Sequence, residues 1–119
     1  MGEIQLGAIE SRFADIIWEE EPISSSELAR RAEEQFGWKK TTSFTVLKRL
    51  CLKGLFRNER GTVTSLISRA EFYATRSKSF VEENFGGSLP AFFAAFTTGR
   101  KLGEEEIAEL KKIIDGIGK

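Results

Sequence analysis

The sequence predicts a mainly α-helical fold with one small β-hairpin, and three observations support this prediction. Apolar residues recur at three- and four-residue spacing in three successive segments, which is the pattern of amphipathic helices. Two short strand-like runs follow, joined by the four residues 58–61, and a link that ends in Gly suits a hairpin. From about residue 69 the sequence is helical again. This order predicts a winged helix-turn-helix over residues 1–68 and a helical dimerisation arm over residues 69–119.

The first two helices have recognisable ends in the sequence. The first is expected over about residues 7–18 and stops before Pro22, because the residue before a proline is pushed out of the helical region. Ser24 is expected to cap the second helix, with Glu27 reaching back to it in a capping box. Gly37 is placed to end that helix in the left-handed conformation.

The charge is balanced only over the whole chain. The 18 Lys and Arg equal the 18 Asp and Glu, yet residues 38–60 hold seven basic side chains and one acidic side chain. Residues 1–37 hold three basic and nine acidic side chains. A local cluster of cations, rather than the net charge, indicates phosphate binding. The alternative is a solvated face whose ionic partners lie in the acidic N-terminal segment.

The third helix, expected over about residues 40–53, has two different faces. At about 100° per residue, one polar arc of about 140° contains Thr41, Thr42, Thr45, Lys48, Arg49 and Lys53. The opposite arc is expected to pack on the first two helices and contains Phe44, Val46, Leu47, Leu50 and Cys51. Leu52 falls inside the polar arc, and we expect it to pack on the hairpin.

The polar arc of the third helix suits the major groove of DNA. Small hydroxyl side chains allow close approach to base edges, while Lys and Arg reach guanine or phosphate. Thr has poor helix propensity, so an ordinary surface helix, the alternative, does not explain three of them in five positions. Basic residues of the hairpin are expected to reach phosphate or the minor groove, or else only to keep the turn soluble. The predicted DNA-binding residues are Lys39, Lys40, Thr41, Thr42, Thr45, Lys48, Arg49, Arg57 and Arg60.

The second half of the sequence is rich in aromatic residues. Six of the ten Phe lie after residue 70, in a segment broken at Gly86-Gly87 and at Gly99. Three short helices cannot bury that much aromatic surface alone, so a second copy of the chain is the expected partner in a helical homodimer. The alternative is an arm that folds back on the winged domain. The predicted dimerisation residues are Phe72, Phe80, Phe85, Phe92, Phe93, Phe96, Ile107, Leu110 and Ile114.

The composition excludes several classes of protein. With no His and only Cys51, the chain lacks imidazole catalysis, a disulfide and paired-Cys metal sites. No nucleophile–base pair or Gly-rich phosphate loop is present. The sequence therefore predicts neither an enzyme nor a bound cofactor or metal. No apolar run is long enough for a membrane span and residues 1–4 lack a basic signal region, so we expect a cytoplasmic protein.

Three motifs resemble the penicillinase-repressor family of winged-helix repressors. The first is Leu6-x3-Glu10-x7-Trp18, which is similar to the opening of that family. The second resembles its recognition helix and reads Trp38-x3-Thr42-x2-Thr45-x-Leu47-x-Arg49-Leu50-x2-Lys53-Gly54. The third resembles its dimerisation helices and reads Phe80-x4-Phe85-Gly86-Gly87-Ser88, followed by Leu102-x4-Ile107-x2-Leu110.

The resemblance implies a homodimeric repressor on a palindromic DNA operator, with the third helix of each subunit in a major groove. Carried over by position, it makes Thr41, Thr42, Thr45 and Arg49 the groove and phosphate contacts. The hairpin is shorter than is usual in the family. Copper-responsive members of the family carry pairs of cysteines near the C-terminus, whereas this chain has only Cys51. The resemblance does not identify a small-molecule inducer. The alternative function is a winged-helix adaptor that binds proteins and not DNA.

Overall fold

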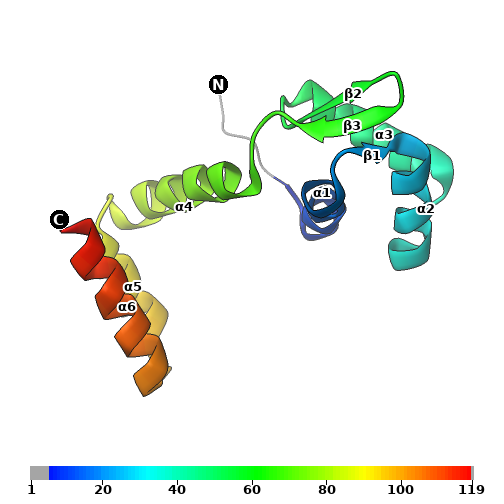
Figure 1. The fold of residues 1–119 in the computed structure, drawn as a ribbon. Helices are drawn as coiled ribbons and strands as arrows, with labels where there is room; N and C mark the ends of the chain where they lie inside the picture. The colour runs from blue at the N-terminus through cyan, green and yellow to red at the C-terminus, as the bar shows by residue number, and fades with distance from the viewer. Residues whose placement is uncertain (1–5, 119) are drawn as a thin grey trace. The chain divides into compact units, whose positions relative to one another are not determined.

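The structure, a computed structural model, describes residues 6–118 of the chain (Figure 1). Six helices and three strands follow in the order α1 (Ala8–Glu20), β1 (Ile23–Ser24), α2 (Ser25–Phe36), α3 (Lys40–Leu52), β2 (Phe56–Glu59), β3 (Thr62–Ser65), α4 (Arg69–Phe85), α5 (Leu89–Thr97) and α6 (Glu104–Ile117). The chain divides into two compact units, residues 1–76 and residues 77–119, and the division falls inside α4. The predicted fold class, mainly α-helical with a small β-hairpin, is confirmed.

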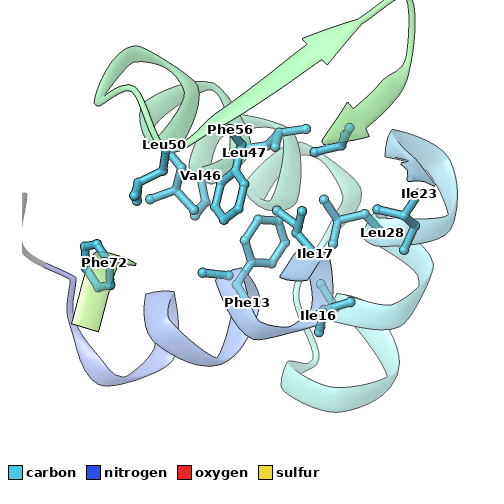
Figure 2. Packing of buried hydrophobic residues seen from close by; sticks show 14 residues of the cluster. Phe13, Ile16, Ile17, Ile23, Leu28, Val46, Leu47, Leu50, Phe56 and Phe72 are labelled. Carbon is cyan, nitrogen blue, oxygen red and sulfur yellow. The ribbon is translucent and has the colours of Figure 1, made fainter. Parts of the chain in front are cut away.

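The core of the first unit lies between its three helices and the hairpin. Figure 2 shows Phe13 and Ile17 of α1 beside Val46 and Leu47 of α3, and all four are buried. Phe56 at the start of β2 is also fully buried in this cluster. Because α3 turns this apolar side toward the core, its opposite side faces solvent.

The predicted helix ends are close to those observed. Helix α1 ends at Glu20, two residues before Pro22. The Ser24 hydroxyl caps α2 by accepting the Glu27 backbone N–H at 3.0 Å. The Glu27 carboxylate does not complete a capping box with Ser24, but accepts hydrogen bonds from Arg30 and Arg31 instead. Gly37 ends α2 with φ at 71°, in the left-handed region.

The hairpin belongs to a three-stranded antiparallel sheet of order β1-β3-β2. The two residues of β1 were not predicted, and Ile23 pairs with Val63 of the central strand. The predicted four-residue link was wrong, because Asn58 and Glu59 pair with β3 and leave a two-residue turn. Arg60 and Gly61 form that turn with φ of 53° and 86°, as a type I′ turn requires.

Glu21 joins the end of α1 to the hairpin. Its carboxylate accepts the backbone N–H of Ser65 at 2.8 Å and the Ser65 hydroxyl at 2.9 Å. This partner of Glu21 was not predicted, since Ser65 lies 44 residues away in the sequence. Charge-assisted hydrogen bonds of this kind are stronger than neutral ones, so Glu21 helps to hold the hairpin against the helices.

The start of α4 belongs to the first unit and packs into its core. Phe72 is 5% exposed, and its ring centroid lies 5.7 Å from that of Trp18. The Trp18 indole N–H donates to the carbonyl of Ile67 at 3.0 Å, just before α4 begins. Phe72 was predicted as a dimerisation residue, but the structure places it in the core of the first unit. The predicted domain boundary after residue 68 thus lies eight residues before the division after residue 76.

Replacing Phe72 with Ala is expected to destabilise the first unit by about 3–5 kcal/mol, the usual loss for a buried Phe. Urea unfolding followed by Trp fluorescence measures this directly, because Phe72 packs on Trp18. Phe80→Ala is the control, since Phe80 is 52% exposed in the second unit. A smaller loss for Phe72→Ala than for Phe80→Ala contradicts the placement of Phe72 in the core.

The second unit has no interior of its own. Its helices break at Gly86-Gly87 and at Gly99, as predicted, and these glycines have positive φ. The rings of Phe80, Phe85 and Phe92 contact one another with centroids 5.6–6.1 Å apart. No residue between 77 and 118 is buried, although this segment is rich in large apolar side chains. Those exposed by more than a third are Phe80, Leu89, Phe93, Phe96, Ile107, Ile113, Ile114 and Ile117.

Candidate nucleic-acid interface

The solvent side of α3 gathers most of the predicted DNA-binding residues. Five exposed polar or basic side chains lie along it, and two exposed lysines lie at or just before its first turn. We call this set the α3 face: Lys39, Lys40, Thr41, Thr42, Thr45, Lys48 and Arg49. The core beneath it contains Val46, Leu47 and Leu50, so the orientation of α3 is set by packing.

The lysines of the α3 face have their charges available. Within residues 6–118, no ion pair joins Lys39, Lys40 or Lys48 to a carboxylate, whereas the arginines of α2 are neutralised. Arg30 pairs with Glu27 and Glu34, and Arg31 pairs with Glu20 and Glu27. Of these two helices, α3 and not α2 therefore presents cations without an ion-pair partner within the described range, which suits a polyanion at α3.

Arg49 is held by an ion pair to α1. Its Nη1 lies 2.6 Å from Oε2 of Glu10, and the other carboxylate oxygen of Glu10 accepts the Gly7 N–H at 3.2 Å. The Glu10 side chain is 20% exposed, whereas that of Arg49 is 51% exposed. Glu10 is thus a fixed support that holds Arg49 through one guanidinium nitrogen. The pair was not predicted, because no sequence pattern links residues 39 positions apart.

The pKa of Glu10 is lowered from its usual value of 4.5, chiefly by the hydrogen bond from the Gly7 backbone and then by Arg49. A carboxyl with a lowered folded-state pKa stabilises the fold above its unfolded value and loses that contribution as the pH falls through the folded value. Wild-type protein is therefore expected to lose more stability than Glu10→Gln between about pH 6 and about pH 3. Urea unfolding across this range tests it, and parallel losses in the two proteins would exclude the contribution.

The hydroxyl groups of the α3 face occupy its N-terminal half. The Thr45 hydroxyl donates to the carbonyl of Thr41 at 2.9 Å, so its lone pairs are left to accept from a donor outside the helix. Thr41 and Thr42 are exposed in the first turn. A surface with short hydroxyls between longer cations can approach base edges closely and still reach phosphates.

Two apolar residues of α3 lie in environments that differ from those predicted. Phe44 was assigned to the buried arc but is 40% exposed, and Leu52, expected to pack on the hairpin, is 80% exposed. Phe44 is at the edge of the apolar arc, only about 40° around the helix from Lys48, so the core does not reach it. Cys51 is half-buried, and partial burial raises the pKa of its thiol, in keeping with a packing role.

The hairpin places one of its two predicted contacts on β2 and the other at its tip. Arg57 is exposed on β2, with its guanidinium 3.9 Å from the Glu59 carboxylate. Arg60 is exposed in the turn. Asn58 stabilises that turn by accepting the Gly61 N–H at 3.1 Å. Arg60 therefore projects from a defined turn, and Arg57 projects from the strand that leads into it.

Other kinds of site find little support in the part of the chain that the structure describes. No group of three or more His, Cys, Asp or Glu there is arranged to hold a metal ion. None of the helices described is both long enough and apolar enough to cross a bilayer.

Comparison with known proteins matches this architecture. The family model of the penicillinase repressor matches residues 6–116. The penicillinase repressor of Bacillus licheniformis is 28% identical over 115 residues, which cover 93% of this chain and 90% of that protein. The methicillin resistance regulatory protein MecI of Mammaliicoccus sciuri is 23% identical over 115 residues, which cover 93% of this chain and 94% of that protein.

A solved structure is also similar. The solution structure of the DNA-binding domain of the repressor BlaI matches with a TM-score of 0.51 at 26% identity, covering 60% of this chain and 93% of that domain. This likeness confirms the winged-helix fold predicted from the sequence. The chain therefore belongs to the penicillinase repressor family and is a regulator, not an enzyme.

Proposed function

We propose that this chain is a cytoplasmic, sequence-specific transcriptional repressor that binds a palindromic DNA operator as a homodimer, with α3 in the major groove. The α3 face is the observation that supports this most directly. It combines exposed Thr41, Thr42 and Thr45 with lysines that have no carboxylate partner among the described residues. The similar BlaI domain is a DNA-binding domain, which adds support for the same activity.

The exposed apolar side chains of the second unit support the homodimer. Residues 77–118 bury no side chain by themselves, and a monomer with Ile114 and Ile117 at 64% and 76% exposure would present a large apolar patch to water. An identical copy would cover this surface in a symmetric interface. A two-fold dimer places its two α3 helices on two half-sites, so the operator is expected to be a palindrome.

Selection of bound sequences from a random DNA pool, repeated at low and moderate salt, tests the proposed function. A shared palindrome with half-sites about one helical turn apart is the expected result. Binding that has no shared sequence and disappears at moderate salt would show only non-specific attraction to phosphates. In that case the protein-binding adaptor would be the better assignment, and the α3 face would be its docking surface.

A further inference from the structure

Phe44 is an apolar side chain on an otherwise polar part of α3. It follows Lys40 and Thr41 by one helical turn and precedes Lys48 by one turn. It is 40% exposed, and the partly buried residues that pack on the core do not include it. The core therefore does not account for a Phe at this position.

We propose that Phe44 is a specificity-determining residue, which contacts the C5-methyl group of thymine in the operator. This inference rests on the proposed function, because it requires α3 to lie in the major groove. The thymine methyl is the apolar group that base pairs present in that groove, and Phe is among the side chains that contact it. The hydroxyls and cations around Phe44 contact polar edges and phosphates, and the ring adds a large apolar surface among them.

The position of Phe44 along the helix favours base contact over a general apolar role. Recognition helices contact base edges mainly through their N-terminal residues. Phe44 is the fifth residue of α3, whereas Leu52 is the last one. Leu52 is twice as exposed, at 80%, but it lies two turns further along and is followed by Lys53 and Gly54. Leu52 is therefore the matched control for a large exposed apolar side chain on the same helix.

Replacement of thymine by deoxyuridine removes only the methyl group, so it tests the contact from the DNA side. In duplexes that contain the selected operator, each thymine is replaced in turn in both half-sites, and Kd is measured by fluorescence anisotropy with the full chain. Wild-type protein is expected to lose about fourfold in affinity per half-site at one position, the effect of one buried methyl group. Phe44→Ala is expected to bind the thymine and uracil duplexes equally at that position, and Leu52→Ala to discriminate as the wild type does.

The outcomes separate this inference from the proposed function. The role of Phe44 is overturned if uracil lowers the affinity of Phe44→Ala and of the wild type equally at every position. It is also overturned if no thymine replacement lowers the affinity of the wild type. In both cases a selected palindrome would still support the proposed function. A pool that yields no shared sequence overturns both. Because Phe44 lies outside the core, Phe44→Ala should unfold at the wild-type temperature. Phe44→Leu, which keeps an apolar contact, should retain part of the discrimination.

Discussion

Loss of the dimer is the expected result when Ile114 is replaced with Asp. Ile114 is 64% exposed on the apolar side of α6, and a carboxylate there would be buried without a partner in the proposed interface. In a dimer, binding of one subunit holds the second subunit near its half-site at a millimolar effective concentration. Separate chains lack this advantage, so operator affinity is expected to fall by about 100- to 10,000-fold. Sedimentation equilibrium measures the association, and anisotropy with the operator duplex measures the affinity.

Ala108→Asp is the matched control for this experiment. The substitution adds the same charge to the same helix, but Ala108 lies on the side opposite the apolar stripe. This variant should remain dimeric and bind the operator as the wild type does. If Ile114→Asp sediments as the wild type does, the apolar side of α6 is not the dimer interface, and the arm has another function.

The second large effect is expected at Arg49. Arg49→Ala should weaken operator binding by about 1–3 kcal/mol if its free donors reach a base, and should relax the preference at one operator position. If they reach a phosphate, binding should weaken evenly across sequences, and the slope of affinity against salt should fall by about one. Filter binding on the selected operator and on single-base variants, at several salt concentrations, distinguishes the two cases.

Arg69→Ala is the control for Arg49. Arg69 also forms an ion pair with a carboxylate of α1, at 2.9 Å from Asp15, and is exposed to a similar extent, but it lies outside α3. Loss of this pair should change operator affinity by much less. An unchanged affinity in Arg49→Ala would remove Arg49 from the interface and leave the pair with Glu10 as a purely structural link.

Most of the fold of the first unit could be predicted from local signals. The spacing of apolar residues, the Ser24 cap and Gly37 each act within a few residues, so the positions of α1, α2 and α3 follow from the sequence. The hairpin turn was predicted less well, because the length of β2 depends on cross-strand pairing of Asn58 and Glu59. Phe72 was assigned to the wrong environment, since its burial depends on Trp18, which is distant in the sequence.

In the candidate site, too, features set by local sequence were predicted and features set by packing were not. The helical period placed Thr41, Thr45 and Lys48 on one face, and the structure agrees in their exposure. The support of Arg49 by Glu10 was not predicted, because an ion pair between two helices depends on how they pack. Apolar character predicts burial for Phe44, yet this criterion is least reliable at the edge of a helix stripe, where Phe44 lies.

Because residues 77–118 bury no side chain, repression is expected to depend on the concentration of the protein in the cell. In the proposed dimer the partner supplies the interior of the arm, so ordering of the arm and association are a single equilibrium. When most of the protein is monomeric, halving its amount removes about three quarters of the dimer. Dilution by cell growth and degradation of the protein would then lower the concentration of the dimer steeply. A modest fall in synthesis of the protein would be enough to relieve repression.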